Sequence, residues 1–248
     1  MGTCNVAMSE TGSNERVREK RMSKDAFYAT PIYFTDLVDS TALNEHLIAD
    51  IRAWRQRDPQ GTVRSNVAHA GAWHSATDMH TRHEFDPLSR EIFEMMQGIY
   101  DELGYDSDFE PVCDSMWANV NSRHAYNRHH THPHALWSGV YYVQAPDDCG
   151  LLYFTDPRPQ TQILTPYYDP RRRHASTWNE VFYQPREGRL IVFPAWLMHA
   201  VHPNLSSEEG EAGERISISF NFYQLRRGSK FRNPNRKEVV AGDLAPRS

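Results

Sequence analysis

Four of the chain's 13 histidines lie in the stretch HHTHPH at positions 129–134. Histidine is the commonest side-chain ligand of transition metals, and residues at i and i+2 of an extended segment point to the same side. His130, His132 and His134 share that side, whereas His129 does not. The stretch alone is consistent with a solvated loop, a metal site, or a catalytic or structural hydrogen-bonding role.

Two more histidines occur in FPAWLMHAVHP, after the apolar run RLIVF at 189–193. They are His199 and His202, and the turn that Pro194 begins would place a side chain at the mouth of a cavity. A third ligand from this segment would complete an imidazole-rich site. With no thiolate nearby, such a site favours zinc, copper, nickel or iron over magnesium or calcium.

The run RISISFN at 215–221 alternates strictly between polar and apolar residues, so a strand would place them on opposite faces. The polar face comprises Arg215, Ser217, Ser219 and Asn221; the apolar face comprises Ile216, Ile218, Phe220 and Phe222. Two interpretations remain open. The polar face lies in water on the protein surface, or it lines a wet cavity inside a barrel while the apolar face packs under helices.

A first amphipathic helix is predicted from Ser40 to about Arg57, because its apolar residues recur at the 3.6-residue period. Ser40 or Thr41 is available as its N-terminal cap. The predicted core face holds Leu43, Leu47, Ile48, Ile51 and Trp54.

A second helix has clearer boundaries. Asp86 is the predicted cap, Pro87 suits the first turn, and Gly104 ends the helix. The predicted apolar stripe holds Leu88, Ile92, Phe93, Met96, Ile99 and Leu103. Between the two helices, the residues from 65 to 80 show no sustained period and predict a loop with a short strand.

After residue 110 the pattern changes to short β-like runs separated by Gly, Pro and Asp turn signals. The runs are MWANVN, WSGVYYV, LLYF, EVFY, RLIVF and RISISFNFY. This pattern predicts a mainly β fold, a barrel or jelly roll with flanking helices. The connection from Pro157 to Asn179 is long, and long loops inside compact domains are often functional.

The composition of the 248 residues indicates one sizeable domain. A formal charge of −5 gives no general attraction to nucleic acid or to an anionic membrane, so the expected partner is a small molecule or a protein. Three dispersed cysteines, Cys4, Cys113 and Cys149, indicate a reducing, cytoplasmic setting. No apolar run approaches the ~20 residues of a membrane span. We expect a disordered polar leader at 1–24 and a basic C-terminal tail at 226–248.

The ordered set of motifs resembles the Fe(II)- and 2-oxoglutarate-dependent oxygenases, and within them a little-characterised group. The motifs are HTH at 130–132, SGVYYV at 138–143, FTDPR at 154–158, GRLIVFPAWLMH at 188–199 and RISISFNF at 215–222. The resemblance implies a double-stranded β-helix, which is a cupin-like jelly roll. It extends over roughly residues 26–224 and predicts a single oxygenase-like domain at 25–225.

The resemblance also implies a metal site. His130 and His132 take the positions of the family's H-x-D/E pair, and His199 takes that of the distal ligand. The usual facial triad has two histidines and one carboxylate, so histidine at 132 is a departure that would make the site more positive by one charge. Two alternative metal ligands are possible: Asp156 from a neighbouring strand, or His134 in place of one histidine of the pair.

The implied cosubstrate site lies on the polar strand. Arg215 and Ser217 take the positions that grip the distal carboxylate of 2-oxoglutarate, and a planar charged guanidinium suits that task. Tyr142 is expected to add a hydrogen bond, although Tyr141, which has the opposite parity, remains open.

The activity implied by the resemblance is that of an oxygenase, most simply a hydroxylase. It would use Fe(II), dioxygen and 2-oxoglutarate, and couple decarboxylation to oxidation of an unidentified small-molecule or protein substrate. Two alternatives remain: a cofactor-free, three-His cupin-type dioxygenase, and a non-catalytic jelly-roll module that binds a metal or ligand. We expect specificity to lie in the loop at 157–179 and around AGAWHS at 70–75. Pairing of edge strands would allow a homodimer.

Overall fold

The structure is a computed structural model that describes residues 24–65, 72–164, 166–229 and 237–244. The chain divides into two compact units, Met1–Thr30 and Pro31–Ser248, and all the helices and strands below belong to the second. Cys4 and most of the predicted leader lie outside the described residues.

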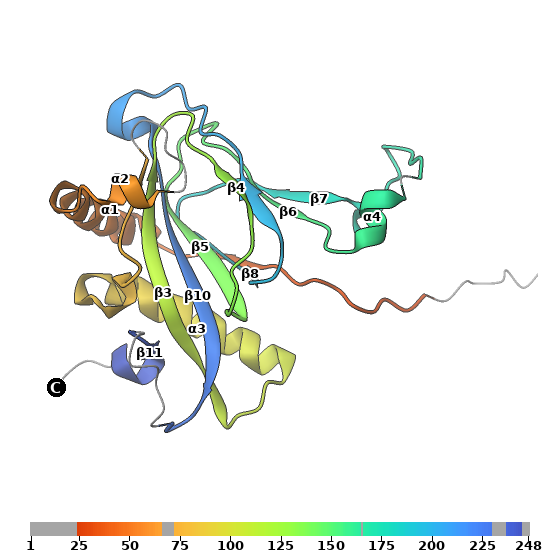
Figure 1. The fold of residues 1–248 in the computed structure, drawn as a ribbon, viewed down its shortest axis with the longest axis horizontal. Coiled ribbons are helices and arrows are strands. Elements are labelled where there is room, and N and C mark those ends of the chain that lie inside the picture. Colours follow the sequence, from red (N-terminus) through yellow and green to blue (C-terminus); the bar gives the residue numbers. More distant parts are fainter. Residues whose placement is uncertain (1–23, 66–71, 165, 230–236, 245–248) are drawn as a thin grey trace, which may run out of the picture. The chain divides into compact units, whose positions relative to one another are not determined.

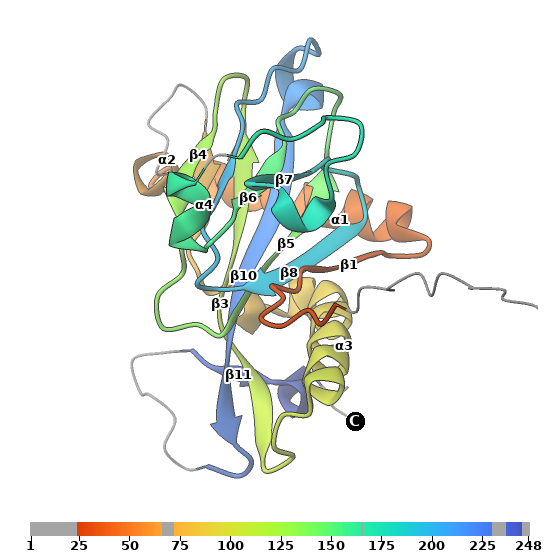
Figure 2. The same ribbon diagram turned by 90° about the vertical axis from the view of Figure 1, so that its right-hand side faces the viewer.

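The described strands form two antiparallel sheets that face each other (Figures 1 and 2). The larger sheet has the order β1-β8-β5-β10-β3-β11, with β2 also paired to β3. Its strands are β1 Tyr33–Asp36, β2 Trp73–His74, β3 Phe109–Asn121, β5 Trp137–Gln144, β8 Arg189–Pro194, β10 Arg215–Arg226 and β11 Val239–Val240. The smaller sheet has the order β4-β9-β6-β7. It comprises β4 Asn127–His130, β6 Leu152–Thr155, β7 Glu180–Tyr183 and β9 His199–Val201. This architecture confirms the predicted double-stranded β-helix.

Helices cover the larger sheet on the side away from the smaller one, as α1 does in Figure 1. The α-helices are α1 Ser40–Arg57, α2 Gly61–Arg64, α3 Asp86–Leu103 and α4 Pro159–Ile163. The 3-10 helices are Met79–Thr81, His83–Phe85, Ala175–Thr177, Gly210–Gly213 and Ala241–Leu244. None of the helices in the described residues combines the length and the hydrophobicity that crossing a bilayer requires.

The two long helices have the predicted bounds, but their starts differ from the prediction. Asp39, rather than Ser40 or Thr41, occupies the N-cap of α1, and it makes no side-chain cap hydrogen bond. In α3 the N-cap is Phe85, so Asp86 is already the first helical residue. Gly104 ends α3 with φ of 67°, a left-handed conformation that suits glycine.

The apolar stripes of the helices pack on the apolar face of β10. Ile51 of α1 and Met96 of α3 join Ile218 and Phe220 of β10 in one buried cluster. Leu103, predicted to belong to the stripe, is 42% exposed at the end of α3 because the helix stops there. The structure thus confirms one part of the cavity interpretation of RISISFN: the apolar face of this strand packs under helices.

The charged segments near the C-terminus are built into the fold. The acidic stretch at 208–214 contacts α1, where Glu214 pairs with Arg55 at 2.6 Å. The predicted boundary at 225 falls one residue before the end of β10, and β11 pairs with β3. Lys237 forms an ion pair with Asp78 at 2.7 Å. Residues 237–244 are thus part of the domain rather than of a separate tail.

Candidate active site

Three histidines converge at one end of the smaller sheet. His130 ends β4 and His199 begins β9, and the antiparallel register places them opposite each other. His132 follows in the loop after β4, and its Nε2 lies 3.3 Å from Nε2 of His199. One ligand atom from each of the three lies within 4.8 Å of the others. The structure therefore brings together the three residues that the sequence proposed as ligands.

Backbone carbonyls fix the orientation of two of these rings. Nδ1–H of His130 donates to the carbonyl of Arg128 at 2.7 Å, and Nδ1–H of His199 donates to that of Leu197 at 2.9 Å. In a neutral imidazole with a proton on Nδ1, the Nε2 lone pair is free to bind a metal. Two of the rings are therefore held in the tautomer that a metal ligand requires.

The site favours neutral imidazoles. Burial, and after it the neighbouring His130, lowers the pKa of His132 to about 4. Burial, followed by the same neighbour, lowers the pKa of His199 to about 3. Both rings are neutral at pH 7, which is the metal-binding form. Imidazole nitrogen donors suit iron, zinc, copper or nickel better than magnesium or calcium.

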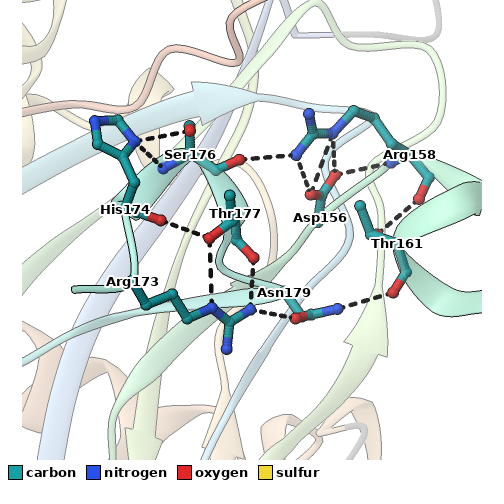
Figure 3. Close-up of polar contacts among 8 residues, drawn as sticks. All are labelled: Asp156, Arg158, Thr161, Arg173, His174, Ser176, Thr177 and Asn179. Carbon is teal, nitrogen blue, oxygen red and sulfur yellow. Dashed lines mark hydrogen bonds and ion pairs between the residues drawn. The ribbon is translucent and has the colours of Figure 1, made fainter. Parts of the chain in front are cut away.

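The alternative ligands lie outside this group. His134 is exposed and has φ of 72° in the loop after His132. His129 is also exposed, and its Nε2 lies 3.4 Å from Oγ1 of Thr155. Asp156 is held by Arg158, whose Nη2 lies 2.5 Å from its Oδ2 (Figure 3). Arg158 keeps the pKa of Asp156 below its usual range.

Replacement of Asp156 by asparagine should therefore leave metal binding nearly unchanged. We expect the Kd for Co(II), measured by titration of its visible absorption, to stay within about twofold of the wild-type value, because the carboxylate is bound by Arg158 and lies outside the group of three histidines. The exposed ion pair with Arg158 would be lost, at a cost of about 1 kcal/mol or less. A large loss of Co(II) affinity would make Asp156 a ligand.

A cavity of about 380 Å³ lies between the two sheets and includes the three histidines in its wall. Arg215 and Ser217 line it from β10, and this confirms that the polar face of the strand lines a cavity. Arg215 is only 1% exposed. Its Nη1 donates to the carbonyl of Cys149 and, at 3.3 Å, to that of His202.

The other terminal nitrogen of Arg215, Nη2, has no hydrogen-bond partner among the described residues. A buried guanidinium N–H without an acceptor is costly, and most such groups in folded proteins are satisfied. Burial lowers the pKa of Arg215, but arginine remains charged in proteins. An anionic ligand in the cavity would satisfy both the charge and the free N–H.

The structure separates the two neighbouring tyrosines. Tyr142 lines the cavity and pairs with Ser217 in the β5–β10 register. Burial raises the pKa of Tyr142, so its hydroxyl stays protonated. Tyr141 points to the helices, where its hydroxyl donates to Oδ1 of the buried Asn44 at 2.6 Å. Of the two, only Tyr142 is placed to contact a ligand in the cavity.

This separation predicts opposite effects for two conservative variants. Tyr142→Phe should raise the Kd for 2-oxoglutarate about tenfold or more, since a hydrogen bond to a charged carboxylate contributes about 1.5–3 kcal/mol. Tyr141→Phe should leave that Kd unchanged but lower the free energy of unfolding by about 1–3 kcal/mol, because Asn44 loses its donor. Calorimetric titration and urea unfolding of both variants test the assignment, and exchanged phenotypes would refute it.

Sequence reasoning missed part of the cavity wall. Strand pairing of β2 with β3 places His74 opposite Asn119, and Trp117 lies two residues earlier on the same face. All three line the cavity. Trp117 and Asn119 are two residues apart in MWANVN, so the sequence shows that they share one face of a strand. It does not show that this face is the one that lines the cavity.

The long loop after β6 has a different place from the one expected. The described residues of 157–179 do not line the cavity of the histidines. They form their own network, in which Arg173 donates to Oδ1 of Asn179 at 2.7 Å and to the carbonyl of Thr177 (Figure 3). The AGAWHS segment, by contrast, supplies His74 to the cavity.

The fold and the site thus define a jelly-roll protein with a cavity that is lined by three histidines and a buried arginine. Residues 115–221 match the model of a family described as "Putative 2OG-Fe(II) oxygenase". The match covers less than half of the chain, and together with the fold it supports placing this part of the chain in the 2OG-Fe(II) oxygenase superfamily. No curated protein sequence matches the chain.

Solved structures share the fold at low sequence identity. A prolyl-4-hydroxylase from Pseudomonas putida is 17% identical, with a TM-score of 0.52 over 78% of this chain and 94% of that one. The epimerase SnoN from nogalamycin biosynthesis is 12% identical, with a TM-score of 0.53 over 78% of each chain. HygX from Streptomyces hygroscopicus is 12% identical, with a TM-score of 0.51 over 78% of this chain and 82% of that one. These similarities establish the fold alone.

Proposed function

We propose that the chain is an Fe(II)- and 2-oxoglutarate-dependent hydroxylase with His130, His132 and His199 as metal ligands. The observation that carries the proposal is the presence, in one cavity, of three convergent imidazoles and a buried arginine, one N–H group of which has no acceptor among the described residues. The structurally similar HygX was crystallised with nickel and 2-oxoglutarate bound. This supports a site for a metal ion and 2-oxoglutarate in the present chain.

Each residue has a defined task in this proposal. The bound iron would supply the activation of dioxygen, coupled to decarboxylation of 2-oxoglutarate. Arg215 would hold the distal carboxylate of the cosubstrate, because its fork matches a carboxylate and its Nη2 lacks a partner in the described part of the chain. Ser217 and Tyr142 line the cavity on the same face of the larger sheet and would each donate one hydrogen bond. The two sheets would exclude water from the reacting groups.

Dioxygen and an organic substrate are the co-reactants of an oxygenase, and the chemical class of the substrate stays open. Cys113 and Cys149 are free and buried, which supports the proposed reducing, cytoplasmic setting. The homodimer stays a prediction.

The decisive experiment uses the purified protein without oxygen. Addition of Fe(II) and 2-oxoglutarate should produce a weak visible charge-transfer band, and admission of air should release succinate. Metal binding without any binding of 2-oxoglutarate would favour the cofactor-free three-His dioxygenase instead. Binding of both without succinate, across a broad substrate screen, would favour a non-catalytic module.

A further inference from the structure

The three proposed ligands are not held in the same way. His130 and His199 are each anchored through Nδ1 to a backbone carbonyl. Among the described residues, the only side-chain hydrogen-bond contact of His132 is with Nε2 of His199, so its Nδ1 has no anchoring acceptor. The backbone of His132 is fixed, because its N–H donates to the carbonyl of Ala195 at 2.9 Å. Its ring needs another restraint, since the terminal torsion of histidine is broad.

Aromatic packing provides a restraint at this position. The ring centroid of Trp117 lies 5.9 Å from that of His132, with 33° between the planes. Trp117 also stacks on His74, with centroids 5.5 Å apart and an interplanar angle of 11°. His74 is itself fixed, because its Nδ1–H donates to the carbonyl of Ser75 at 2.6 Å and β2 pairs with β3.

We propose that Trp117, backed by His74, is the positioning residue of His132. The stack would replace the Nδ1 hydrogen bond that the other two ligands have, and it would hold the imidazole that stands where the related oxygenases have a carboxylate. This inference rests on the proposed metal site. Groups that orient a metal ligand typically change metal affinity by about 10–100-fold when they are removed.

The test compares Co(II) binding by four proteins: wild type, Trp117→Leu, Trp117→Phe and the control Trp137→Leu. Trp137 is a buried tryptophan of the same sheet, but it packs with Tyr33 on the helix side. We expect Trp117→Leu to raise the Kd for Co(II) about tenfold and to alter the visible d–d bands. Trp117→Phe keeps a ring against His132 and should stay within about threefold of wild type. Trp137→Leu should lower the unfolding temperature but leave the bands unchanged.

Three outcomes would contradict either the role of Trp117 or the metal site, and they distinguish between the two. If Trp117→Leu binds Co(II) with the wild-type Kd and bands, Trp117 does not position His132. If Trp137→Leu weakens Co(II) binding as much as Trp117→Leu does, the effect is general destabilisation and the inference is again wrong. If the wild-type protein binds no Co(II), the proposed metal site fails first.

Discussion

Replacement of Arg215 by methionine should weaken 2-oxoglutarate binding at least about 30-fold while Fe(II) still binds. Truncating one partner of a buried, hydrogen-bonded charge pair costs about 2–5 kcal/mol, and each 1.4 kcal/mol is a factor of ten. Arg215 is 1% exposed and its Nη2 has no acceptor among the described residues, so the carboxylate would lose its counter-charge in a buried site. Anaerobic titration of the charge-transfer band measures the effect directly.

The controls for this variant lie on the same strand. Ser217→Ala removes one hydrogen bond to the cosubstrate carboxylate and should raise the Kd about tenfold or more, since hydrogen bonds to charged groups contribute about 1.5–3 kcal/mol. Arg226 lies at the other end of β10, where it pairs with Asp108 and is 70% exposed, so Arg226→Met should have no effect on binding. Wild-type affinity in Arg215→Met would show that the cosubstrate carboxylate binds elsewhere.

The faces of single strands could be predicted from the sequence because alternation is a local property. In β10 the polar and apolar residues fall on the cavity and helix sides as the pattern required. The buried faces of the two long helices could be predicted in the same way, from the 3.6-residue period of their apolar residues. The two tyrosines show the limit: parity separates Tyr141 from Tyr142, but the pairing of Tyr142 with Ser217 is needed to decide which one faces the cavity.

What could not be predicted depends on pairing between distant segments. β4 carries a proposed ligand but has only four residues, and β11 has two, so neither shows a measurable alternation. Such strands are defined by backbone hydrogen bonds with a partner, which any sequence without proline can form. The same holds for His74, which reaches the cavity only because β2 pairs with β3.

The long loop at 157–179 was expected to determine specificity because it is aromatic and basic. Two of its arginines instead have partners close by: Arg158 pairs with Asp156, and Arg173 binds Asn179 (Figure 3). Arg173 also lies over the ring of Tyr168. The loop follows β6, and β6 and β7 lie on the far side of β9 from β4. A loop's composition does not reveal which edge of a sheet it joins.

The proposed metal site is best tested by removing His199, the ligand that lies far along the sequence from His130 and His132. Replacement of His199 by alanine should raise the Kd for Fe(II) or Co(II) at least about 100-fold, more than loss of a supporting group typically costs. It leaves two imidazoles, and the binding of 2-oxoglutarate through the metal should be lost with it. Anaerobic metal titration gives the Kd, and succinate release in air gives the activity.

Two other histidines of HHTHPH provide matched controls for His199→Ala. His134 and His129 are exposed and lie outside the group of three, so their alanine variants should bind metal within about twofold of wild type. A large loss in His134→Ala with normal binding in His132→Ala would exchange their roles, and His134 would then be the third ligand in place of His132. Loss in His132→Ala with normal binding in His134→Ala supports a three-imidazole site, which carries one more positive charge than a triad with a carboxylate.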